Sequence, residues 1–126
     1  MGYYPDLSPY VYMPGFPGLV NVGWLDLNHP FSQGTVEPNV VSRIGELCRY
    51  PVNLMRGYHA CSKCAEFPVR EAYFGDGELR PLGDGEIRVR GISRTYSSPT
   101  LIYHYILRHS YLPPKEFLDA VDRLTD

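Results

Sequence analysis

The most specific motif in the chain is His59-Ala60-Cys61-Ser62-Lys63-Cys64. Two cysteines separated by two residues can place both sulfurs on one zinc ion from a tight turn, and a nearby histidine can supply a third ligand. The chain has only three cysteines and four histidines, so this clustering is unusual. The spacing therefore predicts a zinc-knuckle-like turn with His59, Cys61 and Cys64 as ligands.

A structural zinc site takes four ligands, so a fourth must come from elsewhere in the chain. The candidates are His104, His109, Cys48 and His29. His104 and His109 lie five positions apart, about 140° around the axis of a regular helix. We therefore do not expect both on one ion without a break between them. In treble-clef zinc fingers a helix after a hairpin returns ligands to the knuckle; by this analogy we predict His104, with His109 and Cys48 as alternates.

Other interpretations of the Cys-x-x-Cys pair stay open. A redox dithiol needs a helix start beside a strand, which the flanking Gly57 and Pro68 do not favour. The cysteines can also be buried without any ligand, or hold a catalytic zinc with an open position. A zinc deaminase is excluded, because Cys61 stands where that pattern requires a glutamate. The nucleophile elbow, the Walker loop and the His-Glu-x-x-His helix are all absent, so we predict no catalytic residue.

Ahead of the knuckle the sequence predicts strands at 20–26 and 52–55 with one helix between them. Pro38 suits the first turn of that helix and Pro51 marks its exit. Its apolar residues recur at the three-to-four spacing of one helical face, namely Val40, Val41, Ile44, Leu47 and Cys48.

Beyond the knuckle a Gly-Asp-Gly triplet occurs at 75–77 and again at 83–85. Asp-Gly is a strong turn signal, so a short antiparallel meander is expected, with strands near 70–74, 78–82 and 86–90. Ser98-Pro99 then predicts the start of a second helix. A third helix begins around Pro114, with an apolar stripe formed by Phe117, Leu118, Val121 and Leu124.

These elements predict an α+β fold with a short antiparallel sheet and about three helices. With 126 residues, the chain has the length of one ordinary domain. Residues 1–19 contain a proline every few positions, which disfavours helix and central strand. We expect this segment to lie extended on a single domain formed by residues 20–126, packing through Tyr10 and Tyr12.

The amino-acid composition argues against nucleic-acid binding and against membrane association. Hydrophobic residues make up 44% and the net charge is −2, which disfavours a general nucleic-acid binder. Arg88, Arg90 and Arg94 form one local basic patch, which we interpret as a solvated strand face. Since ten of the twelve basic residues are arginine, we expect Arg–Tyr and Arg–carboxylate contacts. Without an apolar run long enough for a membrane span or a secretory signal, we expect a cytoplasmic protein with no membrane partner.

Two stretches carry a resemblance. The segment 56–64 has the pattern RGxHxCxxC, and 101–117 has the pattern LIxHYxxxHxYxPPxEF. From about residue 20 onward the chain resembles a family of small uncharacterised bacterial proteins with no established activity. The resemblance implies a compact cytoplasmic protein and a link to inter-bacterial toxin–immunity loci. It draws attention to His59, Cys61, Cys64, His104 and His109 without assigning their roles.

We therefore expect a zinc-stabilised protein-interaction module with a protein partner. More specifically, we expect an immunity or adaptor protein of a bacterial toxin or defence locus. The alternative is a small zinc- or thiol-dependent enzyme that keeps an open coordination position. Four protein ligands around the ion favour the module, whereas three ligands and a water favour the enzyme.

Overall fold

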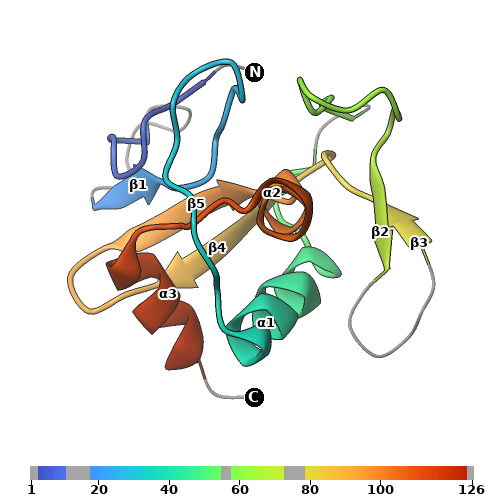
Figure 1. Cartoon of the computed structure of the whole chain (residues 1–126). Helices are drawn as coiled ribbons and strands as arrows, with labels where there is room; N and C mark the ends of the chain where they lie inside the picture. The colour runs from blue at the N-terminus through green and yellow to red at the C-terminus, as the bar shows by residue number, and fades with distance from the viewer. Residues whose placement is uncertain (1–2, 11–17, 55–57, 73–78, 125–126) are drawn as a thin grey trace.

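Figure 1 shows a computed structural model of the chain, which describes residues 3–10, 18–54, 58–72 and 79–124. The helices and strands within these ranges confirm the predicted α+β class. None of the helices has the length and apolar content needed to cross a membrane, within the ranges described. The elements in chain order are β1 (Leu19–Asn21), α1 (Pro38–Cys48), β2 (Arg70–Ala72), β3 (Leu79–Pro81), β4 (Glu86–Arg90), β5 (Thr95–Pro99), α2 (Leu101–His109) and α3 (Lys115–Asp122).

The strands form two sheets rather than one meander. β2 and β3 pair as an antiparallel hairpin, whereas β4 leaves it and joins a three-stranded sheet in the order β1-β5-β4. In that sheet β5 is antiparallel to β4 and parallel to β1. The chain redirects after Pro81, which cannot donate to a further strand, through Gly83 at φ 111°. The strand β5 lies where the sequence predicted a helix start, and the helix begins just after it.

Residues 3–10 lie alongside β1. The Tyr10 amide donates to the Leu19 carbonyl at 2.9 Å, and the Asn21 amide donates to the Ser8 carbonyl at 2.8 Å. The Tyr10 side chain is buried. Several positions of the sequence predictions lie outside the described residues, namely Tyr12, Met55, Arg56, Gly57, the triplet at 75–77 and Glu78.

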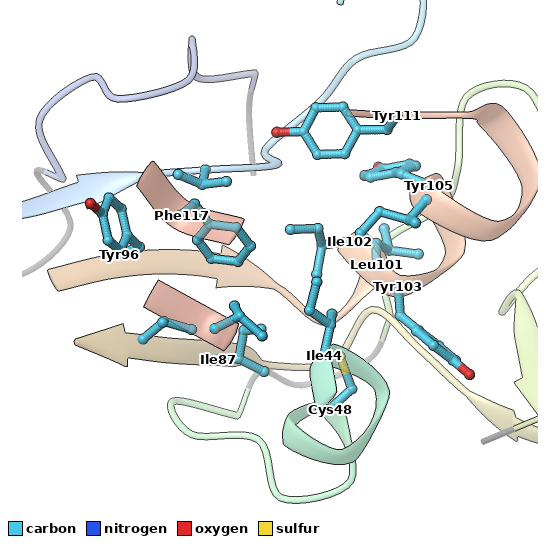
Figure 2. Packing of buried hydrophobic residues seen from close by; sticks show 14 of the residues in the cluster. Ile44, Cys48, Ile87, Tyr96, Leu101, Ile102, Tyr103, Tyr105, Tyr111 and Phe117 are labelled. Carbon is cyan, nitrogen blue, oxygen red and sulfur yellow. The ribbon is translucent and has the colours of Figure 1, made fainter. Parts of the chain in front are cut away.

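The hydrophobic core lies between the three-stranded sheet and the helices (Figure 2). Ile44 of α1, Ile102 of α2 and Phe117 of α3 are completely buried. The Phe117 ring meets Tyr96 of β5 edge to face, with 5.7 Å between ring centroids. The apolar faces of all three helices therefore meet in one core.

Helix α2 lies between the three-stranded sheet and the β2–β3 hairpin (Figure 1). All residues from Leu101 to Ile106 are buried, so α2 is covered on more than its apolar stripe. Its Tyr103 hydroxyl donates to the Ala72 carbonyl of β2 at 3.0 Å. The hairpin thereby covers a face of α2 that the apolar stripe does not occupy, and His104 is buried with it.

Candidate metal centre

The Cys-x-x-Cys segment forms a turn, as its spacing predicts. The Cys64 amide donates to the Cys61 carbonyl at 3.2 Å. The turn is anchored from outside, because the Leu27 amide donates to the Ser62 hydroxyl at 3.1 Å. Cys61 is buried and Cys64 is half-buried, so both thiols lie at the inner edge of the turn.

Helix α2 brings two histidines to this turn. The Nε2 atom of His104 lies 3.3 Å from the Cys64 sulfur. The Nε2 atom of His109 lies 3.4 Å from the Cys61 sulfur and 3.5 Å from the Cys64 sulfur. All four donor atoms lie within 4.8 Å of one another. Two residues of the turn and two of the helix therefore form one cluster.

The sulfur–nitrogen distances between these donor atoms agree with tetrahedral coordination of a metal ion. With zinc–sulfur bonds of about 2.3 Å and zinc–nitrogen bonds of about 2.0 Å, the edges of a tetrahedral Cys₂His₂ site measure roughly 3.3–3.8 Å. The three sulfur–nitrogen distances of 3.3, 3.4 and 3.5 Å fall in that range. The cluster can therefore hold a small divalent metal ion.

The two histidines reach the same cluster from one helix, although their positions are five apart. Both belong to α2, which ends at His109. Beyond it Ser110 adopts the left-handed conformation with φ 56°, and its amide donates to the Tyr105 carbonyl. The two imidazoles lie 5.1 Å apart between ring centroids, and both Nε2 atoms lie within 3.5 Å of the Cys64 sulfur. The angle between the two positions on the helix did not account for the reach of the imidazole side chains.

His104 has a second polar partner on its other side. Its Nδ1 atom lies 2.7 Å from the Glu71 Oε2 atom of strand β2, and both side chains are almost fully buried. Arg108 donates to both oxygens of the same carboxylate, from Nη2 to Oε1 at 2.9 Å and from Nε to Oε2 at 3.1 Å. Glu71 thus contacts the metal cluster through His104.

Glu71 is not among the site residues predicted from the sequence, although a signal for it exists. Successive side chains of an extended segment point to opposite faces, and around the start of β2 Val69 and Glu71 are buried while Arg70 is exposed. A glutamate at an inward position of an apolar alternation requires a buried partner. That position marks Glu71 as a candidate for a site contact.

Burial changes the acid–base properties of the cluster. Burial, together with the neighbouring Cys64 thiol, raises the pKa of Cys61 to about 11. Burial and the adjacent His104 lower the pKa of His109. A bound cation has the opposite effect on the pKa of the thiols, because a thiol that coordinates a metal is deprotonated outright.

The remaining candidate ligands lie elsewhere. His59 is half-buried beside the turn, where its amide donates to the Gly83 carbonyl at 2.9 Å, and its side chain is not one of the four donors. Cys48 is in the core at the end of α1, with its sulfur 3.5 Å from the Thr100 carbonyl oxygen. His29 stacks on the Tyr3 ring at 4.4 Å between centroids. The cluster therefore contains Cys61, Cys64 and His104 with the alternate His109, and neither His59 nor Cys48.

The arginine patch is largely engaged with carboxylates. Arg88 lies 2.9 Å from the buried Glu86 and stacks over the Tyr10 ring at 5.1 Å. Arg94 lies 2.6 Å from Glu116. The predicted Arg–Tyr and Arg–carboxylate contacts are confirmed by these pairs, which reduces the positive charge left for an anionic partner.

Comparison with known proteins places the chain in a family. No curated protein and no solved structure is similar enough to match it. One family model does match, and it spans residues 2–122, nearly the whole chain. This agrees with the resemblance to a family without a known activity. The chain therefore belongs to the family described as Domain of unknown function (DUF7919).

Proposed function

We propose that this protein is a zinc-stabilised protein-interaction module. In this proposal Cys61, Cys64, His104 and His109 bind one zinc ion in a structural site. The observation that carries it is the convergence of four donor atoms, all within 4.8 Å of one another, from the Cys-x-x-Cys turn and helix α2. Zinc is the metal that this donor set suits, because paired thiolates and imidazoles in tetrahedral geometry are typical of structural zinc sites.

The number of donors favours a structural role over catalysis. A catalytic zinc keeps one position for water or substrate, whereas a structural zinc is closed by four protein ligands. Four side chains gather here, which is the number of protein ligands that a closed shell requires. A thiol-dependent enzyme that uses Cys61 is further disfavoured because Cys61 is only 2% exposed, and a nucleophilic cysteine must be accessible to substrate.

The experiment that tests the site is metal analysis of protein purified without a histidine tag. We expect one zinc per chain. After substitution with cobalt, the visible spectrum should be that of a tetrahedrally coordinated Co²⁺ ion with two thiolate ligands. Added anions should leave this spectrum unchanged, since a closed shell has no exchangeable position. Protein without metal contradicts the zinc site, and a spectrum that changes with added anions supports the enzyme alternative.

The proposed interaction role is supported by apolar side chains on the surface. Tyr50 and Leu54 follow α1 and are 75% and 66% exposed. Val52 lies between them, is also exposed, and pairs with Glu86 through an isolated bridge beside β4. Large exposed apolar groups that gather in one place are typical of interfaces. We propose that this patch, residues 50–54, contacts a protein partner.

The narrower proposal is an immunity or adaptor protein of a bacterial toxin or defence locus, acting in the cytoplasm. It rests on the resemblance noted from the sequence and on three cysteines that are free thiols, which suits a reducing compartment. The test is coexpression with the products of adjacent genes, followed by native mass spectrometry. A stoichiometric complex that is lost on Leu54→Glu but kept on Glu46→Gln supports the interaction role, and absence of any complex contradicts it.

A further inference from the structure

The Glu71 carboxylate is buried without being part of the proposed ligand set. Its side chain is 2% exposed, and its described partners are the His104 Nδ1 atom and the Arg108 guanidinium. A buried carboxylate is costly unless every oxygen is paired. The Glu71 carboxylate therefore lies between a candidate metal ligand and an arginine, a position that indicates a role at the metal site.

We propose that Glu71 is the positioning residue of the metal site, an inference that rests on the proposed zinc function. An ionised carboxylate only accepts hydrogen bonds, so the Nδ1 atom of His104, 2.7 Å from Glu71, carries the proton. In that tautomer the lone pair is on Nε2, the atom that lies 3.3 Å from the Cys64 sulfur. Glu71 thereby fixes the tautomer and the ring orientation that a metal ion at the cluster requires.

Arg108 completes this arrangement by holding the carboxylate. Its contacts with both oxygens fix the Glu71 carboxylate while the guanidinium itself remains largely exposed. A zinc ion with two thiolates is neutral, and so is the Glu71–Arg108 pair. The assembled site therefore buries no net charge, which avoids the penalty of an uncompensated buried ion.

The same contact connects metal binding to the β2–β3 hairpin. Glu71 belongs to β2 and His104 to α2, so their hydrogen bond also holds the hairpin against the helix. Linkage is reciprocal: if docking of the hairpin favours metal binding, metal binding must favour docking by the same factor. The hairpin should therefore be more protected in the metal-loaded protein.

The experiment compares Glu71→Gln with a matched control, Glu86→Gln. Glu86 is also a buried glutamate that pairs with an arginine, and the partners that the structure gives it lie outside the cluster. A glutamine can donate to Nδ1 and so permits the opposite tautomer. Zinc affinity is measured in full-length protein by competition with a chromophoric chelator. We expect Glu71→Gln to weaken zinc binding about 10- to 100-fold and Glu86→Gln to leave it unchanged.

Two further measurements keep the inference testable if Glu71→Gln does not fold. In zinc-loaded native protein, imidazole ¹⁵N spectra should show zinc on Nε2 and the proton on Nδ1 of His104. Zinc should also slow amide exchange in β2 and β3. Zinc on Nδ1 of His104, or native affinity in Glu71→Gln, overturns the role of Glu71 while the zinc site stands. Native protein that binds no zinc overturns the proposed function itself.

Discussion

The Tyr10 hydroxyl contacts both carboxylate oxygens of Glu86, at 3.2 and 3.1 Å, across 76 positions of sequence. Glu86 is 1% exposed and also accepts hydrogen bonds from Asn53, Ser97 and Arg88. A residue near the start of the chain thus helps to satisfy a buried charge in the central sheet. This contact gives the segment before β1 a direct part in the stability of the fold.

Tyr10→Phe tests that contact. The phenyl ring retains the packing under Arg88, but Glu86 loses one of its donors. Losing a hydrogen bond to a buried charged group should lower the free energy of unfolding by about 1–2 kcal/mol, measured by urea denaturation. Tyr3→Phe is the control, because Tyr3 is exposed, and it should leave stability near the native value. Equal stability in both variants would show that residues 3–10 do not stabilise the domain through this network.

Cys64→Ser tests whether the metal site stabilises the fold. In small metal-binding domains the free energy of binding becomes free energy of folding, so this change should cost several kcal/mol. A strong chelator should lower the melting temperature of the native protein in the same way. The control is Cys48→Ala, since Cys48 is a buried cysteine outside the cluster; this variant should keep one zinc per chain. A native melting temperature in Cys64→Ser contradicts a stabilising metal.

The two helix histidines should matter equally for metal binding. Because the Nε2 atoms of His104 and His109 both lie near the Cys64 sulfur, replacing either with alanine should weaken zinc binding tenfold or more, on the order of 1.4 kcal/mol. His59→Ala should leave zinc affinity unchanged. Chelator competition measures all three variants. If His59→Ala releases the metal and His109→Ala retains it, the ligand set inferred from the structure is wrong.

Gly45→Ala tests the close approach of α1 and α2. A Cβ atom at this position would lie 2.8 Å from the Tyr103 ring, and the Tyr103 hydroxyl is held by the Ala72 carbonyl. Overpacking of this kind costs about 1–3 kcal/mol, more than the gain in helix propensity that alanine brings. Thermal unfolding should therefore show a lower melting temperature, and an increased one would show that Tyr103 can move aside.

Glu116→Gln should destabilise the protein in a pH-dependent manner. Hydrogen bonds from Tyr96 and Arg94 lower the pKa of Glu116. A carboxyl whose pKa is lower in the folded state contributes stability above its unfolded value, and loses it as the pH falls through the folded value. The melting temperature of Glu116→Gln should therefore lie below that of the native protein at neutral pH, with the two converging under acid conditions. A pH-independent difference would show that the charge of Glu116 is not involved.

The sequence predicted the elements whose signals are local. Proline positions and apolar periodicity place α1 and α3 within a few residues of their observed bounds. The Cys-x-x-Cys spacing also identifies the turn that contributes two of the cluster's donors. In each case the interactions that determine the local structure act between residues that are close in sequence.

The features that the sequence did not predict depend on long-range packing. β5 contains two serines and a proline and becomes a central strand only because β1 and β4 pair with it on either side. His104 and His109 lie about 140° apart around a regular helix, yet both side chains reach the sulfur of Cys64 in the turn. Glu71 meets His104 only after the hairpin docks on α2. A local pattern can mark one of these residues as buried, as the alternation of Val69 and Glu71 does, but it does not identify the partner.

The parallel pairing of β1 with β5 constrains how the chain folds during synthesis. The partners in this ladder, Leu19 with Thr95 and Asn21 with Ser97, are separated by most of the protein. The sheet therefore stays incomplete until the ribosome has released the residues beyond position 97, and until then β1 can pair only with the segment 3–10 that precedes it. Contacts over such long separations slow folding, because loop-closure entropy is lost before they form. Binding of a metal by the newly made turn and α2 would shorten that search by closing a loop of about forty residues.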